Sequence, residues 1–233
     1  MLKSLRVHFL WQLSNKRVYL VAGLLACVCQ SSLATVSLDT AWSLNTRSLT
    51  MRVGAGVGVT GNPVTTVKFD VNNANVSPAP LPVTGVPDIQ GSGVTQANAV
   101  RISVSNNSSQ NYSNNIRVTA DSSTGMICVP GTGCGSTVVP FSTVSWTSYN
   151  VQTGANAGQD FVSGSFTGSG SQLLIDFNPP NYCSGVVFLG FCFGQLRPYS
   201  AAITNDQVFI YNNSTLYPAG QYKGTVTYTA TLP

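Results

Sequence analysis

The chain has 233 residues, of which 43% are apolar and only 8% are charged, so it is long enough to bury a full core but carries few fixed charges. Its formal net charge of +4 comes from Lys3, Arg6, Lys16 and Arg17, which leave seven basic residues against seven aspartates in the rest of the chain, and this excludes a basic nucleic-acid surface. The lone histidine, His8, and the lack of glutamate disfavour histidine triads and histidine–metal sites, so we expect neither a metal nor a cofactor.

Residues 1–34 have the features of a secretory signal peptide. Basic side chains precede a twelve-residue apolar run at 18–29, and small residues up to Ala34 precede the expected cleavage site. The run is shorter than the about 20 apolar residues that span a bilayer. We therefore expect export from the cytosol; a route through the periplasm to the bacterial cell surface is what the family resemblance given below implies. Because residues 24–27 resemble a bacterial lipobox, lipid anchoring at Cys27 is the alternative.

Residues 35–45 follow directly and have the pattern of a β-strand. Side chains of one face recur with a strict period of two, at Val36, Leu38, Thr40, Trp42 and Leu44. A half-apolar strand has to be covered by another element, since an exposed apolar edge templates aggregation.

Residues 46–233 are predicted to form a single all-β domain, an immunoglobulin-like β-sandwich. Apolar, mostly β-branched or aromatic residues alternate with polar ones in run after run, as at Val100, Ile102 and Val104, and no long stretch has helical periodicity. Further runs of this kind are 67–71, 116–120 and 173–177. Clusters of Gly, Asn, Ser and Pro separate the runs and indicate surface loops.

Four cysteines follow the signal peptide, and export predicts that they are oxidised. They are Cys128, Cys134, Cys183 and Cys192. Three connectivities are open, and pairing of sequence neighbours is the simplest because each pair flanks a glycine-containing loop. A zinc site is disfavoured, since neither pair has the short ligand spacing and no histidine completes a mixed site.

Residues 182–193 (YCSGVVFLGFCF) are strongly apolar but do not alternate. With their two cysteines they predict a stapled hairpin. A hairpin buried against the core is the favoured interpretation, and one side of an interface is the alternative.

The C-terminal segment, residues 220–233, alternates like the N-terminal one. One face carries Tyr222, Gly224, Val226, Tyr228, Ala230 and Leu232, and the other carries a lysine and four threonines. We expect a terminal strand with one apolar face.

This ending resembles the last strand of chaperone-usher pilus subunits, including the spore coat protein U-like group. Residues 218–228 (PAGQYKGTVTY) have the Ala-Gly-x-Tyr start that leads into an alternating terminal strand, and Gly220 lies fourteenth from the end, as a glycine commonly does in that family. The family tends to have an aromatic residue next to last, where this chain has Leu232. Residues 35–45 resemble the N-terminal extension that such subunits insert into their neighbour.

The resemblance implies an incomplete sandwich that is completed by donor-strand exchange. The apolar face of the C-terminal strand would line an open groove, and the N-terminal extension of the next subunit would fill it as the donor strand. The implied function is a structural subunit of a bacterial surface pilus that contributes to adhesion. Expected partners are neighbouring pilin subunits, a periplasmic chaperone and an outer-membrane usher, with a host or abiotic surface as a further candidate.

Two other functions compete with the pilus interpretation. Residues 36–44 suit equally the first strand of a self-complete secreted adhesin. Trp42 and Leu44, with the Tyr-rich ending, also resemble the WxL cell-wall-binding domains. We do not expect an enzyme, because the seven aspartates are the only carboxylates and are scattered singly, mostly among turn residues. Two aspartates that meet in space would be needed for a hydrolase.

Overall fold

The computed structural model describes residues 47–54, 64–91, 93–108, 115–153, 157–198 and 202–233. The predicted signal peptide (1–34) and the predicted donor strand (35–45) therefore lie outside the described residues.

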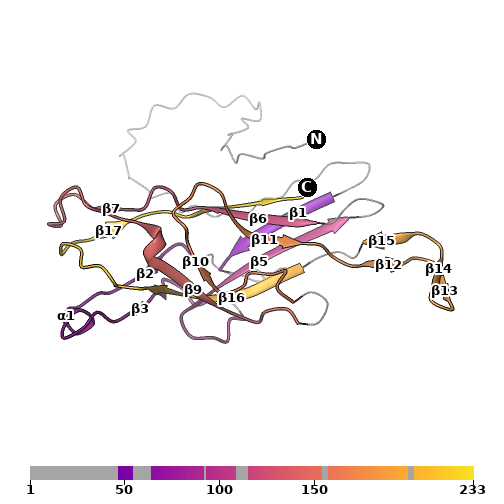
Figure 1. Ribbon diagram of the computed structural model, residues 1–233, viewed down its shortest axis with the longest axis horizontal. Helices are drawn as coiled ribbons and strands as arrows, with labels where there is room; N and C mark the ends of the chain where they lie inside the picture. Colours follow the sequence, from indigo (N-terminus) through magenta and orange to yellow (C-terminus); the bar gives the residue numbers. More distant parts are fainter. Residues whose placement is uncertain (1–46, 55–63, 92, 109–114, 154–156, 199–201) are drawn as a thin grey trace, which may run out of the picture.

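Short and medium β-strands make up most of the described chain (Figure 1). The elements are β1 (Arg47–Val53), β2 (Val67–Lys68), α1 (Asn73–Val76), β3 (Val83–Thr84), β4 (Val86–Pro87), β5 (Ala99–Ser108), β6 (Ile116–Asp121), β7 (Met126–Cys128), β8 (Val138–Val139), the 3-10 helix η1 (Phe141–Thr143), β9 (Val144–Tyr149), β10 (Gly164–Ser165), β11 (Gln172–Phe177), β12 (Asn181–Cys183), β13 (Val186–Phe188), β14 (Phe191–Phe193), β15 (Leu196–Pro198), β16 (Ala202–Tyr211), β17 (Tyr222–Lys223) and β18 (Thr227–Thr231). In the described ranges, no helix has the length and apolar character needed to cross a bilayer.

Two antiparallel sheets form the body of the molecule. The larger has the strand order β1-β5-β16-β9-β10, with β3 beside β16, and the smaller has the order β11-β6-β18. A third ladder, β17-β7-β8, lies next to the smaller sheet along the chain, because β7 follows β6 and β17 precedes β18.

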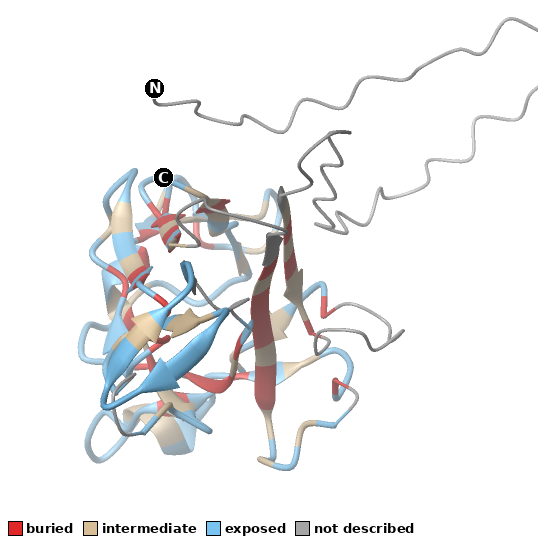
Figure 2. Cartoon of the chain, turned by 90° about the vertical axis from the view of Figure 1, so that its right-hand side faces the viewer, coloured by how far each residue is buried: buried red, intermediate tan, exposed pale blue. Residues whose placement is uncertain are grey.

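The core lies between these two sheets. Val100, Ile102 and Val104 of β5 enter it from the larger sheet and are at most 1% exposed. Ile116 and Val118 of β6 enter it from the smaller sheet and are fully buried. Figure 2 shows the buried residues gathered along the long strands. The expected all-β sandwich is confirmed, because alternating strands bury one face each against a facing sheet.

Two of the predicted alternating segments differ from a regular strand in the structure. Strand structure in the run 67–71 ends at Lys68, and a short helix follows, whose N-cap Asn72 accepts a hydrogen bond from the amide of Ala74 at 2.9 Å. In the run 173–177 the register with β6 shifts between Leu173 and Ile175, so Leu173 is exposed while Ile175 is buried.

Both sequence-neighbour disulfides form, Cys128–Cys134 and Cys183–Cys192. Disulfide bonds of this kind persist in oxidising compartments outside the cytosol. The coarse expectation of an extracytoplasmic environment is therefore supported.

The segment 182–193 forms the expected stapled hairpin, but the favoured burial against the core is wrong. β13 pairs with β14, and the base of the hairpin is the β12–β15 ladder. The hairpin projects from one end of the sandwich (Figure 1), and its large apolar side chains are exposed. No described element covers it, so the apolar character of the segment does not translate into burial.

Candidate functional site

The candidate site is the seam between the first and last described strands of the two sheets. β1 is an edge strand of the larger sheet and β18 is an edge strand of the smaller one. The two strands approach each other, but among the described residues no β-ladder joins them. Within the described part of the chain, the sandwich thus has two neighbouring edge strands on one side, each paired along one edge only.

The apolar residues of this seam are only partly covered. Val53 of β1, together with Val226, Tyr228 and Leu232 of the C-terminal segment, packs against the core but keeps an intermediate exposure. On the next strand, β6, the residues facing the same core are at most 1% exposed. The part of the core beneath β6 is therefore shielded from solvent, whereas the part beside β18 is only partly shielded.

The structure places the six predicted groove residues on one face, as the alternation requires. Tyr222, Val226, Tyr228 and Leu232 are partly buried against the core, and Ala230 is buried. Gly224 faces inward too, because a Cβ there would lie 2.6 Å from the carbonyl oxygen of Gly125 and 2.8 Å from Cζ of Phe141.

The C-terminal strand is interrupted rather than continuous. β17 pairs with β7 through Tyr222, whereas β18 pairs with β6 from Thr227 onward. The three residues between them belong to neither ladder. The predicted terminal strand is thus two short strands that share one inward-facing side.

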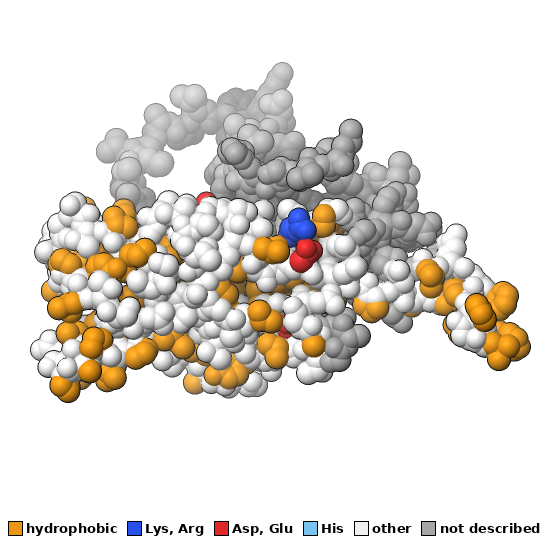
Figure 3. Space-filling view, in the orientation of Figure 1, with side chains coloured by type: hydrophobic (Ala, Val, Ile, Leu, Met, Phe, Trp, Pro, Cys, Tyr) orange, Lys and Arg blue, Asp and Glu red, His pale blue; other side chains and the backbone are white. Residues whose placement is uncertain are grey.

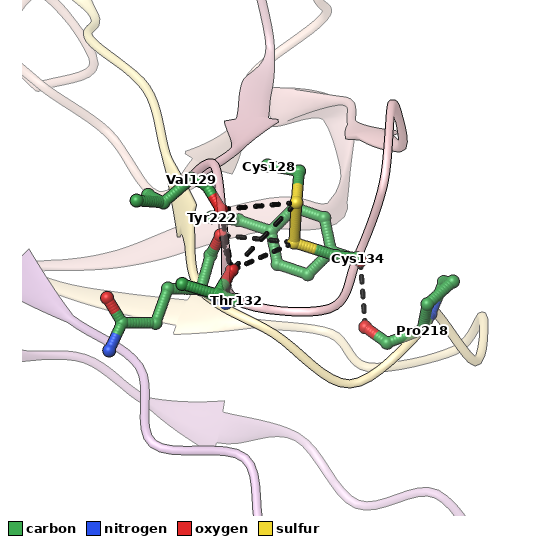
Figure 4. The surroundings of a disulfide bond; sticks show 7 residues. Cys128, Val129, Thr132, Cys134, Pro218 and Tyr222 are labelled. Carbon is green, nitrogen blue, oxygen red and sulfur yellow. Dashed lines mark hydrogen bonds between the residues drawn. A yellow bond between two sulfur atoms is a disulfide. The ribbon is translucent and has the colours of Figure 1, made fainter.

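The Cys128–Cys134 loop holds the start of this segment (Figure 4). The amide of Val129 donates to the carbonyl oxygen of Gln221 at 2.8 Å, and the amide of Gln221 donates to Thr132 Oγ1 at 3.0 Å. A Cβ on Gly220 would lie only 2.5 Å from Sγ of Cys134. Glycine is therefore favoured at this position, the fourteenth from the end, because the disulfide packs directly against its backbone.

Tyr222 adds a second local contact to the same motif. Its hydroxyl donates a hydrogen bond to the carbonyl oxygen of Pro218 at 2.8 Å, and its ring packs edge-on to Tyr217 with centroids 6.5 Å apart. The Ala-Gly-x-Tyr start thus shapes the turn that delivers the chain into the seam.

Of the two strands of the seam, β18 carries no charged residue, whereas β1 contains Arg47 and Arg52. β18 has no ionisable side chain except Tyr228, and burial raises the pKa of that phenol far above its usual value. Tyr228 therefore stays neutral at physiological pH. The uncharged inner face of β18, at an edge of the smaller sheet, is chemically suited to receive an apolar strand.

Each of the six described aspartates has a partner of its own. Arg101 binds Asp206 through two hydrogen bonds of 2.7 and 2.8 Å, and Arg117 binds Asp176 at 2.8 Å. The others bind as follows: Asp70 with Lys68, Asp88 with Thr65, Asp121 with Ser123, and Asp160 with Asn205 and the amide of Gln152. These contacts stabilise turns and sheets, and no described cluster of three or more His, Cys, Asp or Glu residues is placed to hold a metal ion.

The five predicted donor-strand residues, Val36, Leu38, Thr40, Trp42 and Leu44, lie outside the described residues. Sequence reasoning did identify the apolar segment 182–193, but it missed the exposure of that hairpin. The signal that could have shown it was the absence of alternation: Val186 and Val187 are adjacent, so both faces of a two-stranded ribbon must be apolar.

Comparison of the chain with family models, with curated proteins and with solved structures gives no match.

Proposed function

We propose that this chain is a structural subunit of a bacterial surface filament that assembles by donor-strand exchange. In this proposal the segment 35–45 of one copy occupies the seam of the next and pairs with the open edge of β18. Head-to-tail addition gives open fibres where the rotation between successive copies does not close a ring, and the proposal takes this form. The filament would be exported by a periplasmic chaperone and an outer-membrane usher and would contribute to adhesion.

The half-covered face of β18 is the observation that carries the proposal. Inward side chains of the C-terminal segment touch a core that is complete under β6, yet Val226 and Leu232, on either side of β18, remain partly exposed. One additional apolar strand would cover them and pair with the free strand edge at the same time.

The segment 35–45 has the chemistry to be that strand. Burying Val36, Leu38, Trp42 and Leu44 at roughly 1.5 to 3 kcal/mol each gives about 6 to 12 kcal/mol before ordering costs are subtracted. Contacts of that order, with a strand ladder added, favour slow dissociation of the assembled copies.

Insertion into a second copy is favoured over insertion into the same copy by the length of the connection. To turn back beside its own β1, the chain would have to reverse between Leu44 and Arg47, within Asn45 and Thr46. Two-residue hairpin turns favour positive φ at both central residues or glycine at the first, and a β-branched threonine disfavours positive φ. Exchange needs no such turn.

The first test places a charge on the inserted face. Trp42→Asp in the full chain should leave export and folding intact but lower the yield of sedimentable polymer by about a hundredfold or more, because an unpaired carboxylate cannot enter an apolar groove. Ser43→Asp, on the other face of the same segment, is the matched control.

The second test changes the receiving side. Val226→Asp should block polymer formation, while Thr225→Asp should not. Electron microscopy and sedimentation of secreted material provide the measurement.

Equal assembly of Trp42→Asp and Ser43→Asp would refute strand exchange. A wild-type chain that stays a stable monomer would favour the alternative, a self-complete secreted adhesin or a WxL-like wall-binding domain.

A further inference from the structure

A second surface, the apolar finger, lies at the end of the sandwich where β1 begins. We define the finger as residues 186–193, which comprise β13, β14 and their turn above the Cys183–Cys192 disulfide. Leu189 is 82% exposed and Phe191 is 71% exposed, and the remaining large apolar side chains of the finger are exposed as well. Figure 3 shows the finger projecting clear of the body.

The tip of the finger has a costly local conformation. Phe188 pairs with Phe191, which leaves Leu189 and Gly190 as a two-residue turn with φ values of 48° and 82°. Such turns favour Asn-Gly or Asp-Gly, and positive φ is unfavourable for a bulky residue such as leucine. This strained, almost fully exposed leucine gains no burial within the hairpin, and strain of this kind clusters at sites that contact other molecules.

The finger shares its end of the molecule, the finger pole, with the start of β1. Arg47 pairs with Ser108, and Ala202 pairs with Ser105, so β1 begins and β16 begins at the same end of β5. The base of the finger ends at Pro198, shortly before Ala202. The first described residue of β1 and the base of the finger therefore lie at the same end of the sandwich.

The opposite end, the α1 pole, carries a second apolar surface, the α1 patch, which we define as Val71, Leu81 and Leu216. These side chains are 44%, 53% and 75% exposed. The side chain of Asn213 donates hydrogen bonds to the carbonyl oxygens of Asn75 and Leu81, at 2.8 and 3.2 Å. These bonds hold the chain before Leu216 against the stretch that carries Val71 and Leu81. Figure 3 shows apolar side chains gathered at this end, around α1.

Both surfaces lie in stretches without charged residues. Residues 71–87 around the α1 patch contain no Asp, Lys or Arg, and neither do residues 178–196 around the finger. Contact between these two stretches themselves would bury no ionic side chain, which lowers the cost of apolar docking.

We propose that the finger of one copy docks on the α1 patch of the next copy in the filament. This inference rests on the proposed function. β18 runs from Thr227, nearer the α1 pole, to Thr231, nearer the finger pole. A donor strand pairing antiparallel to β18, the slightly more stable arrangement, ends at the α1 pole of the receiving copy.

The connection between the donor strand and the donor's own body is short. Asn45 and Thr46 together span at most about 7 Å, so Arg47 of the donor lies next to the α1 pole of the receiver. The finger pole of one copy then faces the α1 pole of the next. Docking of the finger covers its exposed tip and adds a second contact that acts together with the donor strand.

The test is photo-crosslinking in assembled filaments of the full chain. A p-benzoylphenylalanine at position 191 should crosslink to residues 71–87 or 213–217 of a second copy, as identified by mass spectrometry. The same probe at Leu173, an exposed leucine on β11, is the control and should not reach those residues. Crosslinks only to another finger, only to lipid, or no more frequent than those of the control would overturn the docking.

A double variant distinguishes failure of the finger docking from failure of strand exchange. Leu189→Asn with Phe191→Ser removes the tip, and asparagine tolerates positive φ, so folding is preserved. Filaments of this variant should dissociate about tenfold faster than wild type, while its monomer should bind a labelled peptide of residues 35–45 equally well. If filaments of the variant dissociate at the wild-type rate, the docking of the finger is wrong, but strand exchange is unaffected. Failure of the wild-type monomer to bind the peptide would overturn the proposed function, and the docking with it.

Discussion

The two disulfide-closed segments of this molecule behave in opposite ways. The loop closed by Cys128–Cys134 contains mostly small and polar residues, yet Cys134 is buried and packs against the backbone of Gly220. The loop closed by Cys183–Cys192 is strongly apolar, yet it projects into solvent. Apolar content therefore does not decide which of two stapled segments is buried; a partner surface within reach decides it.

Similar loop lengths make this comparison useful. The cysteines are 6 residues apart in the first loop and 9 in the second, so chain entropy alone predicts similar stabilisation by both disulfides. Any difference between them reports how strongly each loop is coupled to the body.

The largest effect is expected from removing the first disulfide. Cys128→Ser with Cys134→Ser should lower the free energy of unfolding by about 2 to 4 kcal/mol, because the loop anchors the start of the C-terminal segment. Urea titration of the secreted chain measures this. Cys183→Ser with Cys192→Ser should leave the unfolding of the body nearly unchanged and should only expose the finger to proteolysis. Equal losses for the two pairs would show that the finger belongs to the same cooperative unit.

A smaller effect is expected at the contact between the first loop and the chain end. Gly220→Ala should cost about 1 to 3 kcal/mol, since the added Cβ would lie 2.5 Å from Sγ of Cys134 and one of the two must shift. Gly170→Ala is the matched control, because the nearest atom to its Cβ is 4.0 Å away. Thermal melts of both variants give the difference. If Gly220→Ala melts like the control, the loop is not held against the chain end.

The smallest effect on stability is expected in the finger. Val187→Thr with Phe193→Gln should change the free energy of unfolding by less than about 0.5 kcal/mol, because both side chains are exposed. Retention on a hydrophobic-interaction column should fall at the same time. A clear loss of stability would mean that the finger packs on the body in solution.

Much of the fold follows from local pattern. The alternation at Val100, Ile102 and Val104 predicts a half-buried strand, and the side chains are buried as expected. The same pattern fails at Leu173, because a register shift within β11 turns that side chain outward. A shift of this kind depends on the partner strand, so the alternation of a single strand does not contain it.

The side chains of the C-terminal segment that face the core were predictable from the sequence, but their exposure was not. Alternation by itself is enough to place Tyr222, Val226 and Leu232 on one face of a strand. Their partial exposure depends on the order of strands, which leaves β18 at a sheet edge with β1 near it but not paired. Strand order joins residues far apart in the chain, and no local period encodes it.

By itself, the sequence determined the β character, the core faces of the main strands, and the scarcity of charged residues and histidine. These are properties of composition and of period two, which each segment carries alone. Only the tertiary structure decided that the last strand lies at an open edge and that the apolar finger stands in solvent. Both depend on whether a distant part of the chain supplies a covering surface, because burial is a relation between segments.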